Sequence, residues 1–199
     1  MTDKKSEASA QAEADRGFIT GTLVHTADGL MPIEAIQVGD LVLSSANATA
    51  PAAFSLVIGN VRLAAQQTCV VTYFLGDEAT PRYMVCAGGQ PFWTEHEGWT
   101  RADVLCDGVP LITTVETAYA VSANLLFETS LDGVAWTHYD DGTFLGPTVD
   151  MRNGRLEFTE DTHAPASVGG HLAASLHRIE LAERRNYFVG ESGLLVQGG

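Results

Sequence analysis

The hydrophobic and polar residues near the start of the chain alternate with a period of two. Residues 22–26 read Thr-Leu-Val-His-Thr, which is the pattern of a half-buried β-strand. Asp28-Gly29 follows and predicts a tight turn, because glycine adopts positive φ angles without steric cost. Residues 38–40 (Val-Gly-Asp) predict a second turn, and residues 41–43 predict a short buried strand. The opening stretch therefore predicts strands joined by glycine-containing turns.

The same kind of pattern continues along the rest of the chain. Turn residues separate short β-rich runs, which lie at 54–63, 68–75, 82–87 and 110–115. This spacing of short strands favours an all-β fold. Residues about 116–170 are aromatic and rich in turn residues, and we expect a small β-rich insertion there, packed on the core.

One hairpin is predicted inside this insertion. Asn153-Gly154 lies between two runs that contain apolar residues, and Asn-Gly is a strong signal for a hairpin turn. The N-terminal segment differs from both regions. Residues 1–16 are polar and have no apolar face, so little could offset the entropy of ordering them, and we expect a disordered tail.

Residues 17–44 also resemble a known family block. They begin Gly-Phe-Ile-Thr-Gly-Thr-Leu-Val-His-Thr and end Val-Gly-Asp-Leu-Val-Leu-Ser. This is similar to the opening block of the HINT superfamily, the fold shared by hedgehog autoprocessing domains and inteins, and it most resembles the bacterial intein-like domains found before polymorphic toxins. The resemblance implies a horseshoe of short antiparallel strands over residues 17–199, with the insertion inside it.

Two later stretches carry the same resemblance. Residues 85–95 and 98–105 contain Pro-Phe-Trp and Gly-Trp at the places where the family's middle block has them. Residues 176–198 contain Tyr-Phe-Val-Gly-Glu and Gly-Leu-Leu-Val, as in the family's closing block. The matched residues are turn glycines and apolar strand residues, which are the ones that specify the fold.

The residues that carry the family's chemistry are all changed in this chain. The family's first residue is a cysteine whose thiol attacks the preceding carbonyl, a histidine activates that peptide, and a terminal asparagine cyclises to cut the downstream bond. The family's cysteine corresponds to Gly17, its threonine to Ala87 and its first histidine to Gln90. Its later histidine corresponds to Arg185, and its terminal histidine and asparagine correspond to Gln197 and Gly198. Glycine has no nucleophile, and glutamine does not titrate near neutral pH. The resemblance therefore implies a degenerate site with no active catalytic residue.

Other candidate residues offer little replacement chemistry. Thr20 and Thr22 are hydroxyls near the start of the domain, but both belong to the fold pattern and no base is evident for them. His96 is an alternative to Gln90, although placing it there would break the match at the Pro-Phe-Trp run. An acquired enzyme activity in the old cleft would need a nucleophile and base that the sequence does not supply.

No metal site, cofactor site or disulfide framework is expected. The sequence has no Cys-x-x-Cys pair, so Cys69, Cys86 and Cys106 are expected to be reduced thiols. The spacing of the remaining candidate metal ligands fits no motif, and these ligands are His138, Asp140, Asp141, Asp161, His163 and His171.

The charge and hydropathy of the chain restrict the classes of partner that it is expected to bind. The net charge is −14 and the pI is about 4.6, which argues against nucleic acid and against an anionic membrane surface. No run is long enough to span a membrane, and no apolar segment near the N-terminus resembles a signal peptide. We therefore expect a cytoplasmic protein, or one exported without a classical signal peptide.

Together these features predict an inactive HINT-type domain that acts as a scaffold or interaction module, with a relation to polymorphic toxin systems as one expectation of the resemblance. Its expected partner is another protein, bound through the vacated cleft or the insertion. The alternative is an autoprocessing domain whose catalytic residues were substituted, through engineering or through a change to other nucleophiles.

Overall fold

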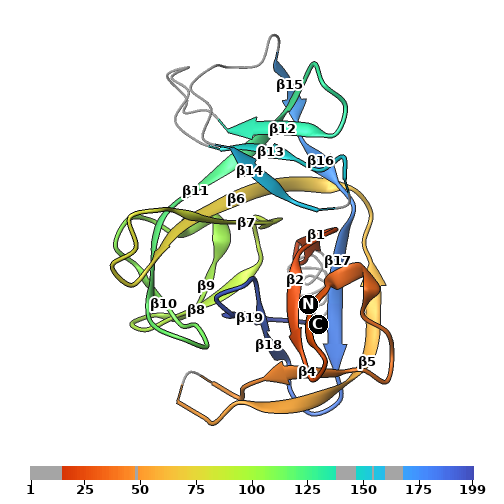
Figure 1. Cartoon of the computed structure of the whole chain (residues 1–199), viewed down its shortest axis with the longest axis vertical. Helices are drawn as coiled ribbons and strands as arrows, with labels where there is room; N and C mark the ends of the chain where they lie inside the picture. The colour runs from red at the N-terminus through yellow and green to blue at the C-terminus, as the bar shows by residue number, and fades with distance from the viewer. Residues whose placement is uncertain (1–14, 48, 138–146, 154, 160–167) are drawn as a thin grey trace, which may run out of the picture.

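The fold is built almost entirely from short antiparallel strands. A computed structural model describes residues 15–47, 49–137, 147–153, 155–159 and 168–199 (Figure 1). These residues contain nineteen strands and two short 3-10 turns, Ile33–Ala35 and Ala102–Val104. The predicted all-β class is confirmed. No helix among the described residues has the length and apolar character needed to cross a membrane.

The opening stretch forms the predicted turns and strands. Strand β1 is Phe18–Ile19, β2 is Leu23–Thr26, β3 is Gly29–Pro32 and β4 is Leu41–Ser44. Strands β2 and β3 form a hairpin. The Thr26 hydroxyl closes its turn by donating to the Gly29 carbonyl at 2.7 Å and accepting from the Asp28 amide at 3.1 Å.

Long strands build the body of the molecule. Strand β5 is Ala53–Arg62, β6 is Gln66–Leu75, β7 is Arg82–Ala87 and β11 is Ala118–Thr129. Strand β6 lies between β7 and β11, and β5 lies between β4 and β17. The three runs predicted between residues 54 and 87 are thus strands with closely similar bounds.

Shorter strands close the structure and bring the two ends of the domain together. They are β8 (Pro91–Thr94), β9 (Gly98–Arg101), β10 (Pro110–Leu111), β17 (Leu176–Leu181), β18 (Asn186–Val189) and β19 (Leu194–Gln197). The first strand, β1, pairs with both β7 and β17. The last strand, β19, pairs with β8, and β18 pairs with β2. Both ends of the domain therefore lie beside the turn that joins β7 to β8.

The predicted insertion shares its first strand with the core. Strand β11 pairs with β6 through residues 118–125 and then continues into a second small sheet. That sheet contains β12 (Val134–Thr137), β13 (Thr148–Asp150), β14 (Glu157–Thr159) and β15 (Val168–His171), and a short strand β16 (Ala173–Ala174) returns to β6. Strands β13 and β14 pair antiparallel on either side of the Asn-Gly pair, as the predicted hairpin requires. Gly154 of the predicted turn lies outside the described residues.

Two apolar clusters hold these sheets together. In the larger cluster, the Phe18 ring meets Phe92 and Tyr187 edge to face, at centroid distances of 6.3 and 6.4 Å. The smaller cluster joins β7 to the second sheet and includes Ala87. Among the cysteines, Cys69 and Cys86 are buried, Cys106 is exposed, and all three are free thiols.

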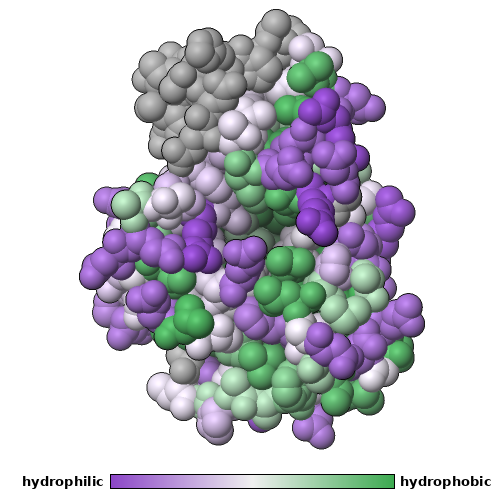
Figure 2. All heavy atoms as spheres, viewed as in Figure 1, coloured by the Kyte–Doolittle hydropathy of each residue, from purple (hydrophilic) through white to green (hydrophobic). Residues whose placement is uncertain are grey.

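Hydrophilic and hydrophobic residues are mixed on the face shown in Figure 2, and hydrophobic ones gather toward its lower end, where Figure 1 places β4 and β5. Alternate residues of β5 there are exposed: Phe54 by 51%, Leu56 by 45% and Ile58 by 53%. The charged residues of the N-terminal flank lie elsewhere. Asp15 and Arg16 contact the body of the domain, whereas residues 1–14 of the predicted tail lie outside the described residues.

Candidate functional site

The buried side chain of Gln90 joins the two ends of the domain. Gln90 lies in the turn between β7 and β8 and is 1% exposed. Its Oε1 atom accepts a hydrogen bond from the Gly17 amide at 2.9 Å. Its Nε2 group donates to the carbonyls of Gln197 at 2.8 Å and Pro91 at 3.2 Å. The structure thus brings together three of the positions that the sequence predicted.

Gly17 has a backbone conformation that favours glycine. Its φ angle is +132°, a value that residues with a side chain rarely adopt. A Cβ atom there would lie 2.9 Å from the His177 carbonyl oxygen, 3.1 Å from the Leu176 Cβ and 3.3 Å from the Leu63 Cδ1. The site has no nucleophile at this position, and its present backbone has little room for one.

Ala87 packs as an apolar core residue. It is fully buried in the cluster between β7 and the second sheet. Its amide donates to the Gly17 carbonyl at 3.0 Å. The position that corresponds to the family's threonine therefore binds Gly17 through its backbone amide and has no side-chain hydroxyl to offer.

The C-terminal end of the domain is also packed closely around a glycine. Gly198 is buried, and its amide donates to the Arg185 carbonyl. A Cβ atom on Gly198 would lie 2.6 Å from the Ile179 carbonyl oxygen and 3.0 Å from a ring carbon of Tyr187. Because both neighbours belong to the packed interior, a larger side chain such as asparagine would require the strands to move.

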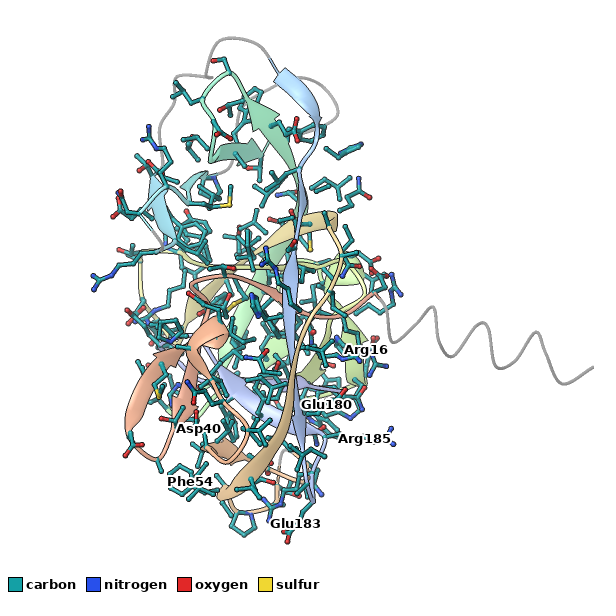
Figure 3. The ribbon with its side chains drawn as sticks, turned by 90° about the vertical axis from the view of Figure 1, so that its right-hand side faces the viewer. Arg16, Asp40, Phe54, Glu180, Glu183 and Arg185 are labelled. Atoms are coloured by element: carbon teal, nitrogen blue, oxygen red, sulfur yellow. The ribbon has the colours of Figure 1, made fainter. Side chains whose placement is uncertain are left out.

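Arg185 contributes its backbone and not its side chain to the centre. The side chain is exposed and lines a shallow surface hollow with Glu180 and Glu183. Figure 3 shows Arg16, Glu180 and Arg185 on the same side of the molecule. Arg16 directly precedes Gly17, and its Nη1 group donates to the Gly198 carbonyl at 3.4 Å, so it links the two ends of the domain.

A cluster of ion pairs holds the residue before Arg16. Asp15 accepts from the Arg101 guanidinium at 3.0 Å, and the same guanidinium contacts Asp103 at 2.6 Å. These two carboxylates raise the pKa of Arg101, with the hydrogen bond to Asp103 as the largest cause. Arg101 and Asp103 are two residues apart in the sequence, but no local pattern indicates that Asp15 joins them, because Asp15 reaches Arg101 only when β9 folds beside the N-terminal flank.

The two threonines considered as alternative nucleophiles lie in different surroundings. Thr22 is buried at 2% exposure, whereas Thr20 is exposed. The Thr20 Oγ1 atom lies 3.4 Å from the His177 Nε2 atom. Burial is the largest cause that lowers the pKa of His177 below its ordinary 6.5, so the neutral imidazole is the main form at pH 7. The sequence gives no signal for this neighbour, because only the β1–β17 register places His177 there.

The other candidate residues do not join this centre. His96 is exposed in the turn between β8 and β9. His171 packs against the Phe127 ring at a centroid distance of 4.6 Å. The described part of the chain holds no group of three residues suited to bind a metal ion. Five of the residues weighed as metal ligands lie outside the described residues, and these are His138, Asp140, Asp141, Asp161 and His163.

Comparison with known proteins identifies the architecture. No family model and no curated protein matches the chain. Among solved structures, a bacterial intein-like domain from Clostridium thermocellum matches with a TM-score of 0.59 and 17% identity, over 92% of this chain and 99% of that domain. The chain has the intein, or HINT, fold.

Two further structures support the same intein fold. The DnaB intein from Synechocystis matches with a TM-score of 0.56 and 10% identity, over 92% of this chain and 99% of that intein. The gp41-1 intein matches with a TM-score of 0.54 and 17% identity, over 92% of this chain and 98% of that intein. The predicted HINT horseshoe is therefore confirmed, while at these identities the chemistry must be argued from this chain's own residues.

Proposed function

We propose that this intein-fold domain is catalytically inactive and acts as a scaffold or interaction module. The observation that carries the proposal is Gly17, which offers no nucleophile and whose backbone would leave only 2.9 Å between an added Cβ and the His177 carbonyl oxygen. Gln90 supports the same conclusion. Its side-chain amide is hydrogen-bonded to backbone atoms at both ends of the domain, Gly17 and Gln197, and a carboxamide does not titrate near neutral pH, so it cannot act as a general acid or base there.

The expected partner of this module is another protein. The vacated cleft and the insertion are the two surfaces that we propose for it, and an association with polymorphic toxin systems is part of the same proposal. The charge of −14 supports a protein partner over nucleic acid or an anionic membrane, since either of the latter would repel an acidic surface.

A fusion experiment tests the proposed inactivity. The full chain is placed between two carrier proteins and incubated with and without a thiol reductant. The fusion is expected to stay intact, with neither carrier released and no ligated carrier pair. Release of the upstream carrier in a thiol-dependent manner would overturn the proposal.

Thr20 and His177 favour one second candidate, which is self-cleavage at a new position. A neutral imidazole can accept the hydroxyl proton as Thr20 Oγ1 attacks the preceding Ile19 carbonyl carbon. That step forms an ester and breaks the Ile19–Thr20 amide bond, and the proton passes to the freed Thr20 nitrogen. Water would then hydrolyse the ester and release residues 1–19. Loss of that fragment from the wild type but not from Thr20→Ala would establish this candidate.

A further inference from the structure

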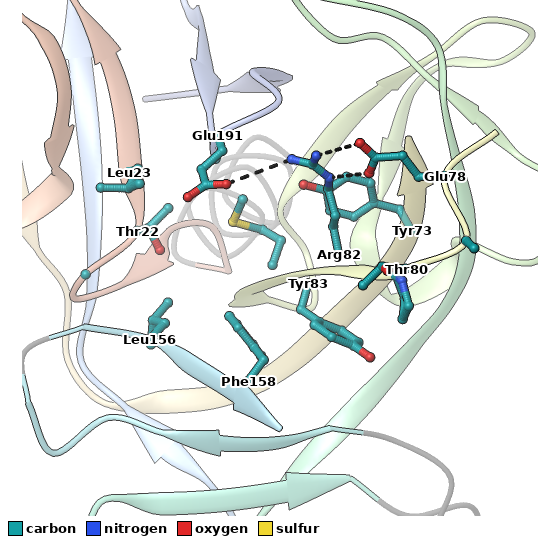
Figure 4. A pocket seen from close by; sticks show the side chains of 15 residues that line it. Thr22, Leu23, Tyr73, Glu78, Thr80, Arg82, Tyr83, Leu156, Phe158 and Glu191 are labelled. Carbon is teal, nitrogen blue, oxygen red and sulfur yellow. Dashed lines mark hydrogen bonds and ion pairs between the residues drawn. The ribbon is translucent and has the colours of Figure 1, made fainter. Parts of the chain in front are cut away.

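A cavity of about 750 Å³ lies between the core and the second sheet (Figure 4). It shares no lining residue with the centre formed by Gly17, Gln90 and Gln197. Its volume falls within the range of about 300–1,000 Å³ that is usual for ligand sites. It is therefore a separate candidate site, apart from the vacated splicing centre.

Part of the wall of this cavity is apolar and aromatic. The rings of Tyr83 and Phe158 are stacked with their centroids 5.1 Å apart and their planes 27° apart. Leu156 and Met84 line the same cavity. Figure 4 shows Leu156 and Phe158 together on the side formed by the second sheet. An aromatic wall of this kind suits an apolar side chain.

The opposite side of the cavity carries excess negative charge. Arg82 makes two hydrogen bonds of 2.9 Å to the Glu78 carboxylate. Glu191 lies 3.9 Å from the same guanidinium, and its side chain is 75% exposed. Glu191 makes only this long ion pair through the Arg82 Nη1 group, and the two carboxylates outnumber the one guanidinium, so Glu191 can also pair with a cation that enters from solvent.

Among the described residues, one edge of strand β14 has no strand partner. It pairs with β13 through residues 157–159, and no other described strand pairs with it. Figure 4 shows β14 between the cavity and β13. The unpaired edge of a strand offers N–H and C=O groups that an extended peptide can use as a template.

We propose that this cavity binds an extended peptide segment of a partner protein. The segment adds a strand to the free edge of β14, places an apolar side chain against Tyr83 and Phe158, and presents a Lys or Arg to Glu191. The inference rests on the proposed function as an interaction module and names the surface and the chemistry of its partner. A second copy of this chain is the less suitable occupant, because each copy carries a charge of −14.

A peptide selection tests this inference. The full chain is used to select from a random library of short peptides, and selected peptides are measured by fluorescence anisotropy. Selected sequences are expected to combine apolar residues with Lys or Arg. Glu191→Lys should weaken their binding about tenfold, because an exposed ion pair is replaced by repulsion. Exchanging the basic residue of the peptide for Glu should restore binding to that variant.

Matched measurements make the test specific. Glu97→Lys makes the same charge change at an exposed site outside the cavity and should leave the affinity unchanged. Bound peptide should slow hydrogen exchange of the β14 amides, residues 157–159. The inference is overturned if the library yields no binder, if both Lys variants weaken binding equally, or if β14 exchange does not change. The carrier-release experiment is independent of these results, so either proposal can fail alone.

Discussion

Gln90 and Gly17 determine at the residue scale what the centre can do. A carboxamide donates and accepts hydrogen bonds at the same time, and Gln90 uses both abilities to link the Gly17 amide with the Gln197 carbonyl. A titrating imidazole at this place could move a proton, whereas the amide holds the backbone of Gly17 and Gln197 in one arrangement. The polar group at the centre therefore has a structural role.

Replacing Gln90 should therefore destabilise the fold. Gln90→Ala leaves the Gly17 amide and the Gln197 carbonyl without their partners, and unsatisfied buried polar groups cost about 1–3 kcal/mol each. We expect the free energy of unfolding to fall by roughly 2–6 kcal/mol in urea denaturation. Gln67→Ala, at an exposed site, should change it by less than about 0.5 kcal/mol. Equal effects of the two variants would contradict the structural role of Gln90.

A thiol introduced at residue 17 should cost stability without producing cleavage. Gly17→Cys must adopt a disfavoured φ and also displace its neighbours, so its cost should exceed about 1–3 kcal/mol for backbone strain alone. Gly29→Cys is the matched control, since Gly29 has a φ of +104° but nothing within 4 Å of its added Cβ. We expect the larger loss of unfolding free energy at residue 17 and no thiol-induced fragment in the mass spectrum. Robust cleavage by Gly17→Cys would show that the centre is assigned wrongly.

At the scale of elements, the pairing of β1 with β17 fixes the surroundings of His177. Phe18 lies opposite His177 in this register, which brings the imidazole to Thr20 and partly buries it. Burial lowers its pKa below the ordinary 6.5, while Glu34 acts in the opposite direction. The folded state then binds this proton more weakly than the unfolded state. The free energy of unfolding therefore keeps its full value above pH 6.5 and falls as the pH drops from 6.5 toward the lower folded-state pKa of His177.

The titration of His177 can be followed directly. Its NMR midpoint should lie below 6.5 in the wild type and lower still in Glu34→Gln, because that variant loses the carboxylate that favours the imidazolium. Arg62→Gln should raise the midpoint, since Arg62 disfavours the charged form. A midpoint that rises in Glu34→Gln would contradict this arrangement.

Ion pairs at the end of β9 hold Asp15 and Arg16, the described residues of the N-terminal flank. Asp15 depends on Arg101 for its ion pair, and an exposed pair contributes about 0.2–1 kcal/mol. Arg101→Ala should therefore speed tryptic cleavage after Arg16 by up to about fivefold. Arg155→Ala removes an exposed arginine elsewhere and should leave that rate unchanged, as followed by the mass of the remaining chain. An unchanged rate in Arg101→Ala would mean that other contacts hold the flank.

At the scale of the whole molecule, the sequence was a good guide to strands and turns but not to contacts across the fold. The period-two pattern and the Asp-Gly and Asn-Gly pairs are local signals, so β2, β3 and the pairing of β13 with β14 could be predicted. Thr20 and His177 are separated by 157 residues, and only sheet register brings them together. The closeness of backbone atoms around Gly17 and Gly198 likewise depends on packing that no local pattern specifies.

The shared strand β11 shows the same limit for the insertion. Residues 118–125 pair with β6 in the core, while residues 126–128 pair with β12 in the second sheet. A continuous strand carries no turn signal at the point where it passes from one sheet to the other. Composition therefore located the β-rich segment but could not show that the core and the second sheet are joined through β11 and enclose a cavity.

The intact mass of the purified full chain, after a day with and without a thiol reductant, tests the central claim most directly. We predict one unchanged species near 21.2 kDa in both samples, because Gly17 supplies no nucleophile and Gln90 no titrating group. Loss of the segment before Gly17, or of the fragment before Thr20, would contradict the proposed inactivity. The mass of the remaining chain would show which of these two bonds had been cut.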